Sequence, residues 1–207
     1  GQVVERSKMV DESNRIFSTT IFNNQFSLPI GNIRNAQYNE SAVFTCDYDQ
    51  DKNGYFDEEN GWWKGAKHVT ESIREITASE GHFGQKCLEV YSSFGAQNNV
   101  YVDPEKTYVF SAWIKPVNDV APLFAVQVMD DGTQIGSADG VPPNMSKEQW
   151  NFFRHEITPD NMADLTKGEE NDYLRIWIGN NAEDQTPHAH FYVDDIRFYP
   201  AGAHVKT

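Results

Sequence analysis

The sequence predicts an all-β protein: a jelly-roll β-sandwich of two antiparallel sheets, preceded by a β-hairpin-like extension. From residue 42 onward, short segments alternate apolar and polar residues and are rich in β-branched and aromatic side chains. Turn signals separate these segments, and none of them shows the apolar periodicity of a long helix. Because each sheet is apolar on only one face, two sheets must cover each other, which gives a sandwich.

Residues 1–40 differ from the rest of the chain. Two short β-like pieces there flank an Asn23-Asn24 turn and a Leu28-Pro29 break. We interpret this segment as an N-terminal extension. It either belongs to a preceding, repeat-like part of a longer polypeptide or packs along the edge of the sandwich. Residues 41–207 are predicted to form the jelly-roll module itself.

Eight strands are predicted in the module, and turn signals such as Asp103-Pro104-Glu105-Lys106 and Asp130-Asp131-Gly132 lie between them. In chain order the strands are AVFTCDY (42–48), HVTESIREIT (68–77), KCLEVYS (86–92), TYVFSAWIKP (107–116), LFAVQVM (123–129), WNFFRHEIT (150–158), YLRIWIG (173–179) and HFYVDDIRFY (190–199). Strand phase turns Cys46 inward and Cys87 outward, so no disulfide between them is expected.

The charge excludes some partners. The chain has 31 acidic and 17 basic residues, a net charge of −14, and its basic residues are scattered rather than gathered in a patch. A polyanion would be repelled, so no nucleic acid is expected as a partner. No apolar run is long enough to cross a bilayer, so no membrane insertion by this segment is expected.

Five stretches carry a resemblance to a known family: NGYFDEENGWW (53–63), GHFGQKCLEV (81–90), KTYVFSAWIKP (106–116), YLRIWIGNN (173–181) and FYVDDIRFYP (191–200). Together they resemble a jelly-roll carbohydrate-binding module over residues 42–200. The stretches NAQYNESAVFTCDYD and DDIRFYPAGA resemble modules of this kind in Bacteroidetes-type RHS/YD-repeat surface proteins. The resemblance implies a non-catalytic module of a larger secreted or cell-surface protein. Its expected partners are a glycan and other domains of the same polypeptide, in an extracellular or cell-surface location.

The resemblance also implies a structural calcium ion. The matching positions are Asp57 and Asp194, with a main-chain carbonyl near Lys86 completing the site. Strand phase alone places the Asp194 carboxylate in one row with Ile196 and Phe198. A buried anion needs a partner, and Ca²⁺, an arginine or a set of backbone amides would each serve.

A second calcium hypothesis uses the loop at residues 49–60. Asp49, Asp51, Asn53 and Gly54 match the first half of an EF-hand loop, and Asp57 falls at its ninth position. The twelfth position is an asparagine, and the flanking segments are strand-like where an EF-hand has helices. An acidic, solvated loop is the alternative interpretation.

Sugar binding requires exposed aromatic rings, because a pyranose offers an apolar face for stacking and hydroxyls for hydrogen bonds. Strand phase leaves Trp113 and Lys115 on the non-core face of one strand, and Arg175 and Trp177 on that of another. We expect these four residues to line one carbohydrate-binding surface. The alternative interpretation is that the N-terminal hairpin covers one of the two tryptophans, Trp113 or Trp177.

No enzyme is predicted, because the sequence contains no Gly-x-Ser-x-Gly elbow, no Cys/His arrangement and no phosphate-binding loop. The function predicted is a carbohydrate-binding-like module with a structural Ca²⁺. The alternative is a structural or protein-interaction β-sandwich that spaces or caps a repeat array and binds no sugar.

Overall fold

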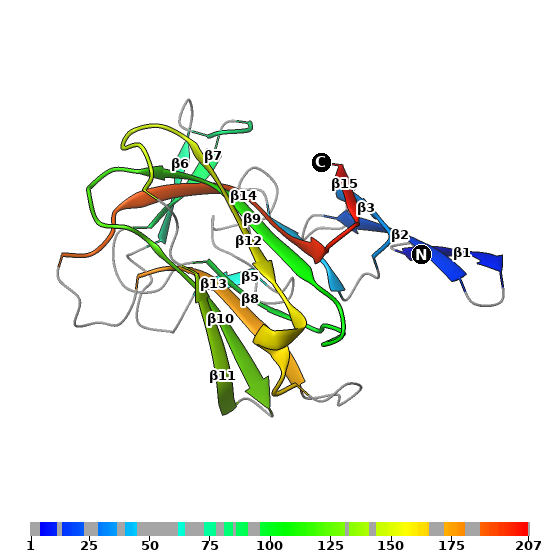
Figure 1. Ribbon diagram of the computed structural model, residues 1–207. Coiled ribbons are helices and arrows are strands. Elements are labelled where there is room, and N and C mark those ends of the chain that lie inside the picture. Colours follow the sequence, from blue (N-terminus) through cyan, green and yellow to red (C-terminus); the bar gives the residue numbers. More distant parts are fainter. Residues whose placement is uncertain are drawn as a thin grey trace.

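The computed structural model is almost entirely β-structure (Figure 1). It describes residues 5–11, 14–22, 29–36, 40–44, 62–64, 73–77, 81–84, 86–90, 96–130, 133–140, 144–165, 172–180 and 187–206. The strands are β1 (Glu5–Asp11), β2 (Asn14–Phe22), β3 (Pro29–Arg34), β4 (Ala42–Phe44), β5 (Trp62–Lys64), β6 (Ile73–Thr77), β7 (Lys86–Val90), β8 (Ala96–Val100), β9 (Tyr108–Pro116), β10 (Leu123–Asp130), β11 (Thr133–Gly140), β12 (Asn151–Ile157), β13 (Asp172–Gly179), β14 (Phe191–Pro200) and β15 (His204–Lys206). A 3₁₀ helix, η3 (Pro159–Met162), follows β12.

The strands form three antiparallel sheets. Sheet A has the order β1-β2-β3-β15, sheet B the order β12-β9-β14-β7-β6 with β4 also paired to β14, and sheet C the order β11-β10-β13-β8-β5. In Figure 1 sheets B and C form the two layers of a sandwich, while sheet A extends to one side. The predicted sandwich of two antiparallel sheets with an N-terminal hairpin-like extension is therefore confirmed.

The main core lies between sheets B and C. Phe110 of β9 stacks against Phe124 of β10 with ring centroids 4.2 Å apart, and Phe153 of β12 packs beside both rings. These three side chains are at most 3% exposed. Burying a phenylalanine contributes about 1.5–3 kcal/mol, so rings like these hold the two layers together.

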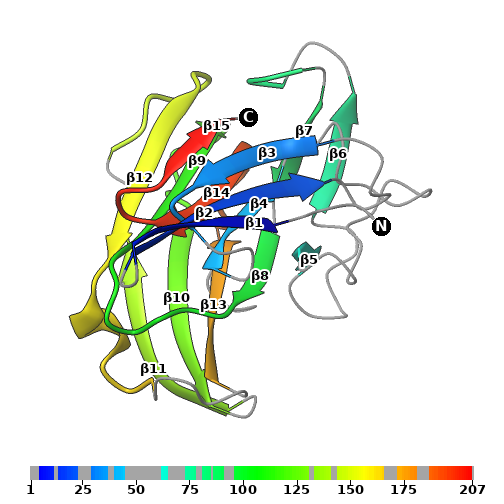
Figure 2. The same ribbon diagram turned by 90° about the vertical axis from the view of Figure 1, so that its right-hand side faces the viewer.

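Sheet A combines the two ends of the described chain. β2 pairs with β3, and β15 pairs with β3 through His204, Val205 and Lys206. A small second core attaches this sheet to the outer face of sheet B: Ile33, Ala36 and Val43 are buried, with Tyr199, Ala203 and Val205 packed against them. Figure 2 shows β3 and β15 in front of β14. The extension and the far end of the described chain therefore both contribute strands to sheet A.

The sequence predicts the long alternating strands but not every strand. Each of the eight predicted segments overlaps an observed strand, namely β4, β6, β7, β9, β10, β12, β13 or β14, whereas β8, β11 and β15 were not predicted. The Asn23-Asn24 turn lies outside the described residues, as does Cys46; Cys87 is fully buried. No helix in the described part of the chain is both long and apolar enough to cross a bilayer.

Candidate functional site

The outer face of sheet C, the side turned away from the main core, carries a polar and aromatic surface. Along β13 the side chains of Leu174, Ile176 and Ile178 enter the core, so Arg175 and Trp177 point to the outer face, as their strand phase predicts. The pattern follows from the pleat, which directs successive side chains to opposite faces. Two of the four predicted carbohydrate-binding residues therefore lie together on this face.

Arg175 is held in place on this face by its neighbours. Its Nε donates a hydrogen bond to Asn99 Oδ1 at 3.3 Å, and a terminal nitrogen donates to the Tyr173 hydroxyl at 3.3 Å. The guanidinium carbon lies 6.0 Å from the Tyr173 ring centroid, a cation–π distance. The Tyr101 ring, 48% exposed, meets Tyr173 edge to face at 6.2 Å. The result is a row of fixed planar groups at the surface.

Side-chain amides border this row on the neighbouring strands. Asn99 and Gln127 lie directly opposite Arg175 in β8 and β10, and Gln97 lies opposite Trp177. Amides both donate and accept hydrogen bonds, so Asn99 and Gln127 together with Arg175 could bind the hydroxyls of a sugar, whereas Gln97 is only 7% exposed. Trp177 itself is only 7% exposed, so among the side chains that the structure describes, Tyr101, Tyr173 and Arg175 form the planar surface open to solvent on this face.

Sequence reasoning missed Tyr101, Tyr173 and the three amides. The signal was present in part, because AQNNV places amide side chains at alternate positions 97 and 99. The segment was not predicted as a strand, because a strand rich in amides lacks the apolar alternation by which strands are recognised.

Trp113 and Lys115 lie elsewhere, and the prediction of one shared surface is wrong. Both belong to β9 in sheet B, whereas Arg175 and Trp177 belong to sheet C. Each pair points away from the core, so the two pairs occupy opposite outer faces of the sandwich. The ring that stacks on Trp113 is that of His82, with centroids 3.8 Å apart, whereas the alternative expectation was a cover by the N-terminal hairpin.

Asp194 also lies on the outer face of sheet B, directly opposite Trp113. The expectation that it shares a face with Ile196 and Phe198 is wrong, because β14 has a bulge between Asp194 and Arg197. Asp195 adopts φ 54° there, and the extra residue reverses the alternation, so Ile196 enters the core that Asp194 avoids.

The Asp194 carboxylate is nevertheless 1% exposed, and backbone amides satisfy it. Its Oδ2 accepts hydrogen bonds from the N–H groups of His82 at 3.0 Å and Phe83 at 3.1 Å, and its Oδ1 accepts one from Asp195 N–H at 2.8 Å. The carboxylate thus anchors the segment 81–84 over the sheet. Asp195 itself is paired with Arg197 at 2.5 Å.

Burial raises the pKa of Asp194 from 3.8 to about 6. The N–H groups of Phe83, Asp195 and His82 lower this pKa, and the charge of Asp195 raises it, but burial has the largest effect. Burial likewise lowers the pKa of His82, with opposing contributions from Asp195, which raises it, and Arg197, which lowers it. Both groups therefore favour their uncharged forms more than they would in water.

The predicted calcium ligands can be compared with this geometry only in part. Asp57 and the EF-hand-like loop lie outside the described residues, and Lys86 opens β7, where its backbone pairs with Thr77. At Asp194 the partner observed is the set of backbone amides, one of the alternatives that the sequence left open. In the described part of the chain, no group of three His, Cys, Asp or Glu side chains is placed to hold a metal ion. The calcium site stays a prediction.

Comparison with known proteins identifies the fold. No protein-family model matches the chain, and no curated protein sequence matches it. Among solved structures, the CBM22-1 xylan-binding domain from Paenibacillus barcinonensis Xyn10C superposes with a TM-score of 0.50 at 14% identity, covering 77% of this chain and 92% of that domain. The CBM22-2 domain of the same protein gives a TM-score of 0.48 at 15% identity, covering 68% and 92%. At such identity the first likeness shows the fold alone: this chain is a jelly-roll β-sandwich like that of a carbohydrate-binding module.

Proposed function

We propose that this protein is a non-catalytic carbohydrate-binding module and that a glycan lies on the outer face of sheet C. The observation that carries the proposal is the row formed by Tyr101, Tyr173 and Arg175, fixed in place and bordered by the amides of Asn99 and Gln127.

The chemistry of this row suits a sugar chain. A pyranose ring stacks its apolar face on an aromatic or guanidinium plane and offers its hydroxyls to neighbouring donors and acceptors. Arg175 is already positioned by Asn99 and by the Tyr173 hydroxyl, so little side-chain entropy would be lost on binding. A neutral glycan is favoured over an acidic one, because the protein carries a net charge of −14.

The first ligand to test is xylan, which the Paenibacillus domain of similar fold binds. We further propose that the module belongs to a larger secreted or cell-surface protein, in keeping with the RHS/YD-type resemblance of its sequence, and that a structural Ca²⁺ involves Asp57 and Asp194. These proposals rest on that resemblance rather than on the geometry of the described residues.

A second candidate is a structural role in which the domain spaces its neighbours and binds no sugar. The pairing of β15 with β3 favours it, because one sheet then holds both the first and the last described strands. Such a sheet would fix the relative positions of segments joined to either end.

A glycan array followed by affinity electrophoresis in xylan, xyloglucan and galactan gels separates these candidates. Arg175→Ala should weaken glycan binding about 10-fold or more, because it removes charge-assisted hydrogen bonds worth about 1.5–3 kcal/mol. Tyr173→Ala should act in the same direction by removing a stacking surface.

Arg34→Ala, which removes an exposed arginine from sheet A, is the matched control and should leave binding unchanged. If neither Arg175→Ala nor Tyr173→Ala changes the retardation of a bound glycan, sheet C is not the binding face. If the wild type binds no glycan, the structural role is favoured.

A further inference from the structure

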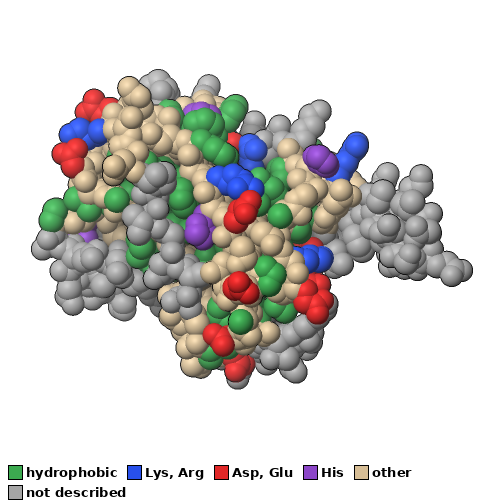
Figure 3. All heavy atoms as spheres, viewed as in Figure 1, with side chains coloured by type: hydrophobic (Ala, Val, Ile, Leu, Met, Phe, Trp, Pro, Cys, Tyr) green, Lys and Arg blue, Asp and Glu red, His purple; other side chains and the backbone are tan. Residues whose placement is uncertain are grey.

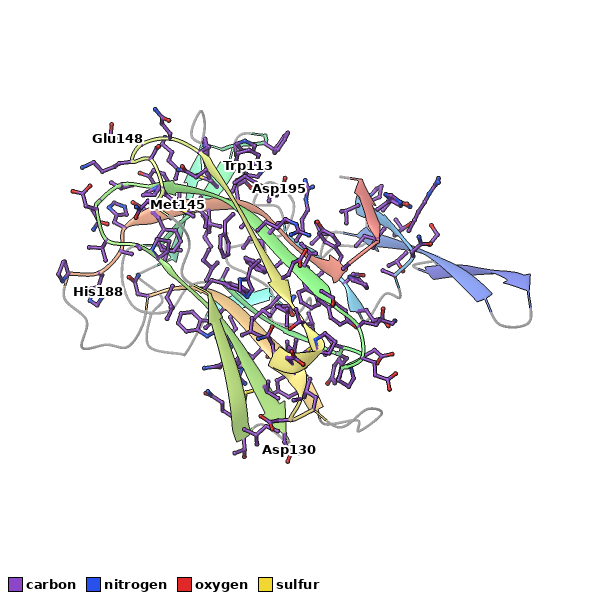
Figure 4. The ribbon with its side chains drawn as sticks, in the orientation of Figure 1. Trp113, Asp130, Met145, Glu148, His188 and Asp195 are labelled. Carbon is purple, nitrogen blue, oxygen red and sulfur yellow. The ribbon has the colours of Figure 1, made fainter. Side chains whose placement is uncertain are left out.

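A second aromatic surface lies on the opposite side of the sandwich, on the outer face of sheet B. We call it the sheet B patch; it consists of His82, Phe83, Trp113, Trp150 and Phe152. Figure 4 labels Trp113 on the upper sheet, and Figure 3, in the same orientation, shows hydrophobic side chains beside a histidine at the upper rim of the described surface. Nothing in the proposed sheet C site accounts for these rings.

The patch is built on the pairing of β9 with β12. Trp113 lies directly opposite Phe152, and their ring centroids are 5.2 Å apart. His82 stacks on Trp113 at 3.8 Å and an interplanar angle of 17°, and it also contacts the Trp150 ring at 5.5 Å. Phe83 meets His82 edge to face at 4.5 Å. The five rings therefore form one connected cluster.

Asp194 fixes this cluster to the sheet. Its carboxylate accepts the N–H groups of both His82 and Phe83, so the backbone that carries these two rings is held directly above β14. A binding surface whose rings are already in place loses little conformational entropy when a ligand arrives. The patch is thus a preorganised surface rather than a loose loop.

Two rings of the patch face solvent. Phe83 is 58% exposed and Phe152 is 53% exposed. Large exposed apolar side chains that lie together mark interaction sites more often than single ones do. A Phe side chain has about 150–250 Å² of surface, so these two present roughly 200 Å² in all.

This exposed area separates possible ligands by size. A stable protein partner needs about 800 Å² of contact on each side, which is several times what the two rings provide. A sugar ring, by contrast, is similar in size to a phenyl ring and stacks on it face to face. The two exposed rings therefore match one or two sugar rings in size, whereas a protein partner would need several hundred Å² of further contact around them.

A polar row runs beside the aromatic one, two residues further along the strands. Lys115 of β9 lies opposite Tyr192 of β14, which lies opposite Glu89 of β7. The Lys115 ammonium sits 5.5 Å from the Tyr192 ring centroid, and Glu89 Oε1 is 2.7 Å from His190 Nε2. Two residues along a strand span about 7 Å, the scale of a single sugar ring. Stacking and hydroxyl-binding groups are therefore adjacent.

We propose that the sheet B patch is a second carbohydrate-binding site, in which a neutral pyranose stacks on Phe83 and Phe152 and Lys115 donates to its hydroxyls. The ligand is neutral because the net charge of −14 repels acidic glycans. Since sheets B and C present their outer faces to opposite sides, a module with both sites binds two sugar chains at once and can cross-link a polysaccharide.

The test removes each site separately. Three proteins are compared with the wild type on the glycan array and in xylan, xyloglucan and galactan affinity gels: Phe83→Ala/Phe152→Ala, Arg175→Ala, and all three changes combined. Both phenylalanines are exposed, so their removal should leave folding intact, as thermal unfolding will show. Phe152→Tyr, which keeps the ring, is the matched control.

The expected result is residual binding of the Arg175→Ala protein to at least one glycan, which falls 10-fold or more when Phe83 and Phe152 are also replaced. Phe152→Tyr should bind that glycan as the wild type does. The wild type should also precipitate a long soluble polysaccharide that neither single-site protein precipitates, because cross-linking needs two sites.

The proposal is overturned if the Phe83→Ala/Phe152→Ala protein binds every glycan as the wild type does. It is also overturned if neither the wild type nor this variant binds a glycan. Loss of all binding through Arg175→Ala alone would overturn the sheet B site and support the sheet C site. Loss of all binding through Phe83→Ala/Phe152→Ala alone would overturn the sheet C site and support the sheet B site. The two proposals can therefore fail independently.

Discussion

Replacing Asp194 with asparagine should remove a pH-dependent part of the stability of the fold. The folded-state pKa of Asp194 is about 6, against an ordinary value of 3.8, because burial disfavours its charged form. The folded protein therefore holds the Asp194 proton more tightly than the unfolded chain does. By linkage, the contribution of Asp194 to the free energy of unfolding is fully present below about pH 4. It is lost as the pH rises toward the folded-state pKa.

The size of the effect follows from the two pKa values. A shift from 3.8 to about 6 corresponds to about 3 kcal/mol over the full titration, at 1.36 kcal/mol per unit. Between pH 4.5 and pH 7.5 the loss is about 2 kcal/mol, because part of the titration is already complete at the lower pH. For a chain of this size that corresponds to a change in Tm of about 4–8 °C.

The assay is urea unfolding of the wild type and of Asp194→Asn at several pH values between 4.5 and 7.5. Other titratable groups are present in both proteins, so the difference in the free energy of unfolding isolates Asp194. As the pH rises from 4.5 to 7.5, the free energy of unfolding of Asp194→Asn should increase by about 2 kcal/mol relative to that of the wild type. An Asn side chain also places its NH₂ group near one of the three donating amides. This contact lowers the free energy of unfolding of Asp194→Asn by an amount that does not depend on pH.

The reasoning would be refuted if the difference in the free energy of unfolding between the two proteins stayed constant with pH. It would also be refuted if the wild type gained stability relative to Asp194→Asn as the pH rises. The same experiment tests calcium. A cation bound at Asp194 would favour the charged carboxylate, so millimolar Ca²⁺ at pH 7.5 should stabilise the wild type but not Asp194→Asn. An identical Tm for the wild type in Ca²⁺ and in EDTA would contradict the calcium proposal.

Three further experiments test other parts of the structure. Lys106→Met should lower the free energy of unfolding by about 2 kcal/mol, because Lys106 Nζ bonds the buried Glu40 carboxylate at 2.7 Å; an unchanged urea midpoint would show that the ion pair contributes nothing. Ile33→Ala should speed hydrogen exchange in β2 and β3 while β9 and β13 stay protected, because Ile33 fills the small core under sheet A; uniform loss of protection would show that both cores unfold together. The His82 ring should titrate below 6.5 by NMR, because burial disfavours its charge; a pKa above 6.5 would contradict its stacked position on Trp113.

The sequence predicted the sandwich because alternation is a local property. In β13 the apolar residues Leu174, Ile176 and Ile178 repeat with a period of two, so their direction follows from the pleat once the strand exists. The outward direction of Arg175 and Trp113 could be predicted for the same reason. A strand such as β8, with the sequence AQNNV, gives no such signal, because its formation depends on pairing with β13 and β5.

What the sequence by itself determined was the fold class and, within the regular strands, the face on which each side chain lies. Only the tertiary structure decided which sheet each strand joins, and it therefore placed Trp113 and Trp177 on opposite sides of the molecule. It also decided the partner of Asp194, because one extra residue at Asp195 reverses the alternation of β14 and brings the amides of His82 and Phe83 to the carboxylate. The physical reason is that strand phase follows from local geometry, whereas sheet order and bulges depend on contacts between residues far apart in the chain.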